Sequence, residues 1–170
     1  KAPDCFEIEE ALRERMPIPV FHDDQHGTAI IVAAAVLNGL KIAGKDISKA
    51  KICTSGAGAA AIACLNMLMA VGAKRENIWV ADREGLVTTR RDNSVDRWRG
   101  AFAQDSDKTS LAEVMQGADI FLGLSAAGAL KRIALLSDLG AAVADADLVI
   151  EAVPEVLSIK QALYEKLAGL

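Results

Sequence analysis

The sequence predicts a three-layer α/β sandwich with a mostly parallel sheet, and three observations support this fold class. Short apolar runs that suit strands alternate along the chain with longer apolar runs that suit helices. Hydrophobic residues make up 52% of the chain and aromatic residues only 4%, so small aliphatic side chains must build the core, as is usual where helices pack on a parallel sheet. With 170 residues, the chain is long enough for one domain with a sizeable core.

The predicted elements follow one another in a regular alternation. Apolar or amphipathic runs of helical length predict helices, at residues 6–16, 27–42, 59–71 and 111–115. Shorter apolar runs predict strands, at residues 51–55, 77–81 and 119–124. Pro17 ends the first helix, and Gly44 suits the C-terminal cap of the second. Residues 84–109 are polar and rich in Arg and Asp, so we expect loop and irregular structure there.

The chain contains an internal repeat. Residues 111–122 align without gaps on residues 139–150, an offset of 28 positions. Each copy reads as a short helix, an Ala-Asp turn and an apolar strand. One explanation is that consecutive helix–strand units of such folds resemble one another. The other is that two related segments have been joined.

Charge and hydropathy exclude several classes of function. Lys and Arg number 19 and Asp and Glu number 23, and the resulting net charge of −4 argues against a nucleic-acid or anionic-membrane surface. Gly, Asn or a charged residue interrupts each long apolar stretch within about 18 residues, so no membrane span is predicted. No signal peptide is visible. The chain starts at Lys1, without an initiator Met, in what reads as the middle of a segment, and this suggests a fragment or a processed chain.

Three cysteines, Cys5, Cys53 and Cys64, are an odd number without CxxC spacing. They predict no disulfide framework and favour a reducing cytoplasm. Cys53 lies in a predicted strand and Cys64 in a predicted helix. Both read as core residues, because a free Cys behaves as a small hydrophobe.

A glycine-rich turn carries the strongest functional signal. The segment Gly56-Ala-Gly-Ala-Ala-Ala61 follows a predicted strand, opens a predicted helix and fits the G-x-G-x-x-G/A fingerprint. Gly56 permits the tight turn, Gly58 lets the backbone approach a pyrophosphate, and Ala61 lets the helix pack closely on the sheet. Backbone amides at the helix start, from Ala59 and Ala60 onward, then face the phosphates. The pattern predicts a Rossmann-type domain that binds a nicotinamide dinucleotide; the alternative is a Gly/Ala-rich turn that binds nothing.

The next predicted strand ends in Asp82, which lies 26 residues beyond Gly56. A carboxylate there can hydrogen-bond the two hydroxyls of an adenosine ribose, and it repels a 2′-phosphate. Arg83 can instead stack on adenine and pair with that phosphate, or it is a solvated loop charge. The dipeptide leaves the choice between NAD and NADP open.

The segment His22-Asp-Asp-Gln-His26 is the densest group of candidate ligands and bases. Asp23 or Asp24 can cap a helix that begins near Gly27, which is an ordinary role for carboxylates before a helix. A zinc site built from His22, Asp24 and His26 is disfavoured, because three residues so close in sequence make a poor tetrahedral cage. The third option is that the carboxylates hold a hard cation beside a substrate.

These residues carry a specific resemblance. Pro19-Val-Phe-His-Asp-Asp-Gln-His-Gly-Thr-Ala-Ile30 resembles the malic enzyme signature. Lys1-Ala-Pro-Asp-Cys-Phe-Glu-Ile-Glu-Glu10, the glycine-rich turn and Gly123-Leu-Ser-Ala-Ala-Gly-Ala-Leu130 are similar to the same family, in its bacterial type. The resemblance covers about residues 1–131. It adds Gly123 and Ser125 to the expected cofactor-binding residues.

Malic enzymes convert malate to pyruvate and carbon dioxide with NAD or NADP and Mg²⁺ or Mn²⁺. The resemblance implies that Asp24 is a metal ligand and that Asp23 lies beside the substrate and assists proton transfer. A divalent ion chelated by malate acidifies its hydroxyl and stabilises the enolate, while hydride passes to the nicotinamide. The implied partners are therefore the dinucleotide and, in the full enzyme, malate or pyruvate; the resemblance is compatible with a homo-oligomer.

The family's Glu-Asp metal pair and its catalytic Tyr and Lys lie upstream of the segment that begins at Lys1. We therefore expect the isolated chain to bind metal weakly and to be catalytically incomplete. The predicted organisation is an incoming helix and active-site-like loop at residues 1–26, followed by a dinucleotide-binding domain at residues 27–170.

The C-terminal part departs from the malic enzyme pattern. Residues 132–168 resemble the cofactor domain of 3-hydroxyacyl-CoA dehydrogenases, most specifically over Leu148–Glu155. A join of two Rossmann segments near residue 131 explains the repeat, because both parents would carry the same helix–strand unit. One alternative function is thus a dinucleotide-binding module without catalysis, or an engineered hybrid. Another, which rests on the last segment alone, is dehydrogenation of a hydroxyacyl-CoA.

Overall fold

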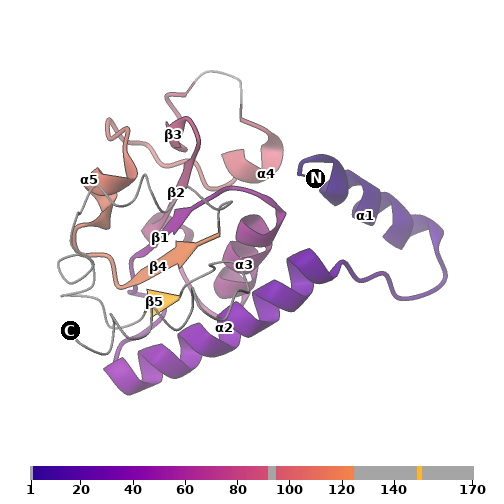
Figure 1. Cartoon of the computed structure of the whole chain (residues 1–170), viewed down its shortest axis with the longest axis horizontal. Coiled ribbons are helices and arrows are strands. Elements are labelled where there is room, and N and C mark those ends of the chain that lie inside the picture. The colour runs from indigo at the N-terminus through magenta and orange to yellow at the C-terminus, as the bar shows by residue number, and fades with distance from the viewer. Residues whose placement is uncertain (1, 92–94, 125–148, 151–170) are drawn as a thin grey trace, which may run out of the picture.

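The computed structural model describes residues 2–91, 95–124 and 149–150 (Figure 1). Its helices are α1 (Asp4–Arg15), α2 (Asp23–Ala43), α3 (Ala59–Ala70), α4 (Arg97–Gly100) and α5 (Leu111–Met115), with a 3₁₀ turn at Arg75–Asn77. Its strands are β1 (Ile52–Ser55), β2 (Ile78–Asp82), β3 (Gly85–Leu86), β4 (Ile120–Gly123) and β5 (Val149–Ile150). Helices and strands predicted from periodicity are confirmed to within a few residues, except at the start of α2.

The strands form one sheet in the order β3-β2-β1-β4-β5. β1 pairs in parallel with β2 and with β4, β4 pairs in parallel with β5, and β3 alone runs antiparallel to its neighbour. The predicted mostly parallel sheet is confirmed. The irregular segment at residues 84–109 also contains β3 and α4, which are too short to leave a periodic signal in the sequence.

The internal repeat maps onto neighbouring strands. Phe121 is paired with Val149 and Leu122 with Ile150, so each pair is separated by the 28 positions of the repeat. The repeat offset therefore equals the separation of the residues that β4 and β5 pair. The predicted join near residue 131, and the segment that resembles 3-hydroxyacyl-CoA dehydrogenases apart from Val149–Ile150, lie outside the described residues.

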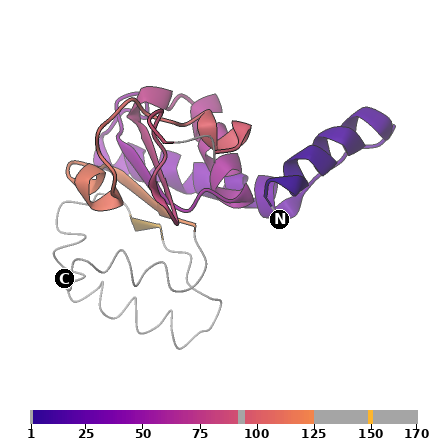
Figure 2. The same cartoon turned by 90° about the horizontal axis from the view of Figure 1, so that it is seen from above.

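Each face of the sheet carries its own core. Ile52 of β1 and Leu122 of β4 belong to a large cluster with the buried sides of α2 and α3. Cys53 of β1 belongs to a smaller cluster on the opposite face, with Val114 of α5 and Leu86 of β3. Successive strand residues point to opposite faces, so this split places helices on both sides of the sheet, as the predicted three layers require. α1 projects away from this body (Figure 2).

α2 begins at Asp23, four residues before the predicted start, and ends at Gly44 in the left-handed conformation (φ 66°), as predicted. The N-cap residue is His22, which makes no side-chain capping hydrogen bond. The expectation that Asp23 or Asp24 caps a helix starting near Gly27 is therefore wrong, because both lie inside the first turn. Carboxylates are favourable there next to the positive end of the helix dipole.

α2 is long and apolar enough to cross a membrane by length and composition alone, with a mean hydropathy of 1.5 over its most apolar stretch. A core helix passes the same test, and one side of α2 packs into the core through Val32, Val36 and Leu40. Its other side exposes Ile31 and Ile42, which are 71% and 89% exposed.

This two-sided character of α2 can be measured. Leu40→Ala should lower the free energy of unfolding by about 2–4 kcal/mol, because it leaves a cavity beneath a side chain that is 4% exposed. Ile42→Ala on the same helix should change it by less than about 0.5 kcal/mol. Urea unfolding followed by circular dichroism compares the two variants, and equal losses would contradict the described packing of α2.

Candidate functional site

The glycine-rich turn joins β1 to α3 and has the geometry that the fingerprint predicts. Gly56 has φ 112°, a region that favours glycine, and its N–H donates to the Ala81 carbonyl of β2 at 2.8 Å. Gly58 is the N-cap residue of α3, and a Cβ built on it would meet nothing within 4 Å. Ala61 is completely buried, which allows α3 to pack closely on the sheet. The turn therefore leaves open space beside Gly58.

The start of α3 suits an anionic group. No side chain caps it, and its first turn, which begins with Ala59 and Ala60, contains no acidic residue. The first N–H groups of a helix lack partners within the helix, and they lie at the positive end of its dipole. Backbone donors are thus available where the open space beside Gly58 lies.

The carboxyl ends of the central strands meet at one edge of the sheet. Ser55 at the end of β1 is paired with Ala81 of β2 on one side and with Gly123 of β4 on the other. Gly56, Asp82 and Gly123 follow or end these strands, so the structure brings three predicted site residues to the same edge. Ser125 lies outside the described residues.

Asp82 is already engaged within the protein. Its carboxylate accepts hydrogen bonds in ion pairs from Arg91 (3.0 Å, to Oδ1) and Arg99 (3.1 Å, to Oδ2), and Oδ1 also accepts from the Glu84 N–H at 2.9 Å. The carboxylate is 9% exposed. Burial works to lower the pKa of Arg91, but the hydrogen bonds and charge attraction from Asp82 and Glu84 together outweigh it and raise that pKa. Both guanidinium groups therefore stay charged beside the end of β2.

A second carboxylate holds Arg99 in place. Asp96 is the N-cap residue of α4, where it accepts from the backbone N–H groups of Trp98 and Arg99, and it pairs with the Arg99 side chain at 2.6 Å. Burial works to raise the pKa of Asp96, but the hydrogen bonds from Arg99 lower it overall. The sequence analysis did not predict that Arg91 and Arg99 pair with Asp82. The Arg-rich composition of residues 84–109 is the sequence feature that could have indicated such partners.

Arg83 lies in a different environment. Its side chain is exposed, and it makes no hydrogen bond or ion pair with any residue that the structure describes. It directly follows Asp82, so it is a further cation at the same edge of the sheet.

Asp23 and Asp24 lie in the first turn of α2 with exposed side chains. A Cβ on Gly27 would lie 3.1 Å from Cγ of Asp23, so glycine makes room for that carboxylate against the helix. Among the described residues, no group of three His, Cys, Asp or Glu side chains is arranged to hold a metal ion. The disfavoured zinc arrangement is absent there, and His26 instead contacts Glu9.

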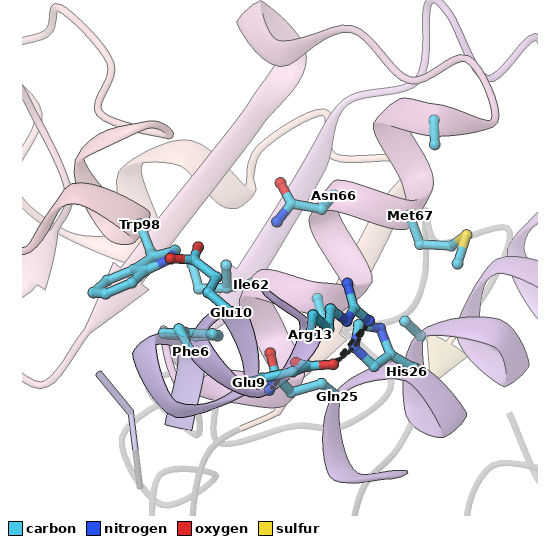
Figure 3. A pocket seen from close by; sticks show the side chains of 13 residues that line it. Phe6, Glu9, Glu10, Arg13, Gln25, His26, Ile62, Asn66, Met67 and Trp98 are labelled. Atoms are coloured by element: carbon cyan, nitrogen blue, oxygen red, sulfur yellow. Dashed lines mark hydrogen bonds and ion pairs between the residues drawn. The ribbon is translucent and has the colours of Figure 1, made fainter. Parts of the chain in front are cut away.

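The start of α2 and one side of α3, from Ile62 to Ala70, share the wall of one cavity. It has a volume of about 380 Å³ and is also lined by α1 and by Trp98 of α4 (Figure 3). Glu9, Arg13 and His26 form its polar wall, and Ile62 and Met67 lie on its apolar side. The polar segment and the helix that follows the glycine-rich turn are therefore neighbours in space.

Together, a central parallel strand, a glycine-rich turn and an uncapped helix define a domain of the dinucleotide-binding Rossmann class. Residues 25–142 match the family described as the malic enzyme NAD-binding domain. The chain belongs to this family. The match runs past residue 131, where the sequence suggested a join.

Relatives with curated names agree with this assignment. The NAD-dependent malic enzyme of Rhizobium meliloti is 68% identical over 131 residues, covering 77% of this chain and 17% of that protein. The NADP-dependent malic enzyme of Haemophilus influenzae is 58% identical over 131 residues, covering 76% of this chain and 17% of that protein. The chain thus spans about a sixth of the length of these relatives.

The fold is also that of a solved malic enzyme. The crystal structure of the Entamoeba histolytica enzyme matches with a TM-score of 0.68 at 33% identity, over 73% of this chain and 27% of that one. The predicted Rossmann-like α/β fold and the predicted family are both confirmed.

Proposed function

We propose that this chain supplies the dinucleotide-binding part of an oxidoreductase that decarboxylates malate to pyruvate with NAD or NADP. The observation that carries the proposal is the open turn at Gly58, where a helix start without a side-chain cap faces free space. In this role the backbone amides from Ala59 onward donate to the pyrophosphate. Gly56 allows the turn and Ala61 the close packing of α3 behind it.

Asp23 and Asp24 are the groups of this chain that would act on malate. Both are exposed carboxylates, a donor type that suits Mg²⁺ or Mn²⁺, and Asp24 would supply one ligand. When bound, the ion supplies Lewis-acid chemistry at the malate hydroxyl and carboxylate. Asp23, held against the first turn by the space at Gly27, would accept or return a proton at the substrate. The described residues supply only part of the ligand set that a hard cation requires, so metal binding by them alone is weak.

The ion pairs of Asp82 bear on cofactor choice. A carboxylate held by two guanidinium groups is a weaker acceptor for ribose hydroxyls than a free one, and it repels a 2′-phosphate less. Arg83 and Arg99 add positive charge at the same edge. These features favour NADP, with Gly123 and Ser125 as further contacts to the dinucleotide.

The free cysteines support a proposal about the cellular compartment of the protein. Cys5, Cys53 and Cys64 are free and buried. Burial raises the pKa values of Cys53 and Cys64 to about 11, so both stay protonated and unreactive at neutral pH. Free core cysteines fit a reducing cytoplasm.

A second candidate function is a dinucleotide-binding module without catalysis, natural or built by joining two Rossmann segments near residue 131. The matching offset of the repeat and of the β4–β5 register is compatible with it, because a join inside equivalent units preserves the sheet. Both candidates require the same dinucleotide site.

Binding at the glycine-rich turn is testable with one substitution. Gly58→Val should abolish binding of NAD and NADP, because its side chain would fill the pyrophosphate position, while its Cβ would meet no protein atom within 4 Å. Ala70→Val adds the same side chain at the other end of α3 and should leave affinity unchanged. Calorimetric titration measures both dissociation constants, and equal affinity of wild type and Gly58→Val would remove the site from the turn.

Cofactor choice is tested by removing single cations. Arg83→Ala and Arg99→Ala should each weaken NADP binding more than NAD binding, by roughly 10-fold in the ratio of dissociation constants, since each removes a charge-assisted hydrogen bond. Arg97→Ala is the control, because Arg97 pairs instead with Glu10 of α1. An unchanged ratio in both variants would mean that neither arginine contacts the 2′-phosphate.

Turnover tests whether this chain holds a complete malate site. The 170-residue chain with malate, Mn²⁺ and NADP should show no robust rise in NADPH absorbance, because general acid–base help of roughly 10²–10⁴-fold requires positioned groups. Asp24→Ala serves as the control. Turnover that Asp24→Ala removes would instead reveal a complete malate site and exclude the module without catalysis.

A further inference from the structure

Glu9 is a buried carboxylate in the middle of α1. It is 7% exposed, and its two oxygens are shared among three side chains (Figure 3). Oε2 accepts from the side-chain amide of Gln25 at 2.9 Å. Oε1 lies 2.5 Å from Nε2 of His26 and 2.8 Å from Nη2 of Arg13. A carboxylate that is removed from water needs such partners, and two of the three belong to the first turn of α2.

These contacts hold the start of a helix that has no side-chain cap. α2 is the longest helix in the described part of the chain, yet its N-cap residue, His22, makes no side-chain capping hydrogen bond. Helix ends without caps fray, because their first N–H groups have no partners within the helix. The first turn of α2 is instead held from outside, through Gln25 and His26. Gln25 is itself 4% exposed, so its amide depends on Glu9.

The same turn carries Asp23 and Asp24. Both side chains are exposed, and neither makes a hydrogen bond or ion pair with a described residue. Their directions are therefore set by the backbone of the turn. Successive residues of an α-helix are rotated by about 100°, so fixing Gln25 and His26 also fixes the two preceding positions.

Glu9 is not required to hold α1 on the domain. Phe6 packs on Trp98 with ring centroids 4.9 Å apart, and Glu10 pairs with Arg97 at 2.6 Å. α1 is thus attached to α4 independently of Glu9. Glu9 contributes a tie between α1 and the start of α2, next to the contact between Nη2 of Arg13 and Nε2 of His26 at 3.1 Å.

We propose that Glu9 is a positioning residue: it holds the first turn of α2 through Gln25 and His26, and thereby directs the carboxylates of Asp23 and Asp24. The consequence for the reaction rests on the proposed function, in which these carboxylates serve a divalent cation and a substrate. The positioning itself does not require the reaction and can be measured without it.

The test compares Glu9→Ala and the milder Glu9→Gln with Glu10→Gln, which removes the same charge one residue away on the exposed side of α1. Nuclear magnetic resonance of the 170-residue chain gives amide hydrogen exchange and the χ1 populations of Asp23 and Asp24 from three-bond couplings to Cγ. Glu9→Ala should accelerate exchange at Gln25 and His26, whose N–H groups donate to the His22 carbonyl, by roughly 10-fold, and it should average the χ1 distributions of Asp23 and Asp24. Glu9→Gln should be intermediate, and Glu10→Gln should match wild type.

Mn²⁺ alone provides the second measurement. Added to wild type and to Glu10→Gln, it should broaden the Asp23 and Asp24 resonances selectively, and in Glu9→Ala this selectivity should fall several-fold. Unchanged χ1 populations and exchange in Glu9→Ala would overturn the proposal. Amide exchange that accelerates equally in the first turn of α2 and in β1, in both Glu9→Ala and Glu9→Gln, would also overturn it. Glu9 would then stabilise the fold as a whole and would not position the first turn of α2 specifically. Absence of broadening in wild type would count against the metal role of Asp24, while exchange and couplings would still decide the role of Glu9.

Discussion

Parallel pairing of β1 with β2 on one side and β4 on the other is the constraint on which the described fold depends. A strand in that position is covered on both faces, and Ile52, Cys53 and Thr54 are all fully buried. The buried hydroxyl of Thr54 cannot remain without a partner, and it donates to the Leu122 carbonyl of β4 at 3.0 Å. Parallel neighbours also require crossover connections, so the chain that leaves β1 must cross a face of the sheet as α3.

The location of the candidate site follows from that topology. The connection from β1 to β2 covers one face with α3, and the connection that leads into β4 covers the other with α5. The two crossovers pack on opposite faces of the sheet, so no common helix among the described residues closes over the carboxyl ends of β1 and β4. This is the switch point at which open α/β sheets bind ligands. The glycine-rich turn lies there because β1 ends there.

Local sequence patterns were sufficient to predict most of the sheet and of the helices next to it. The turn at Gly56–Ala61, the cap at Gly44 and the strands of the parallel sheet each depend on neighbours within a few residues, and these predictions are confirmed. The repeat offset of 28 equals the separation of the paired residues in β4 and β5, although no pairing was predicted from it. The start of α2 was predicted too late, because a Gly in a polar segment reads as a boundary, whereas the helix there is held by Glu9 on another element.

The ion pairs of Asp82 could not be predicted from local sequence patterns either, because they also depend on contacts between different elements. Arg91 and Arg99 lie 9 and 17 residues further along the chain, in a segment without periodicity, and only the folded loop and α4 bring them to β2. The choice between NAD and NADP is usually inferred from the charge of the one side chain at the end of this strand. Here Asp82, Glu84 and Asp96 face Arg91 and Arg99, with Arg83 beside them, so negative and positive charges are equal in number. Under the proposed function, cofactor preference at this edge would depend on which guanidinium group can leave its carboxylate for a phosphate. That property belongs to the whole cluster and is not encoded by the Asp-Arg dipeptide alone.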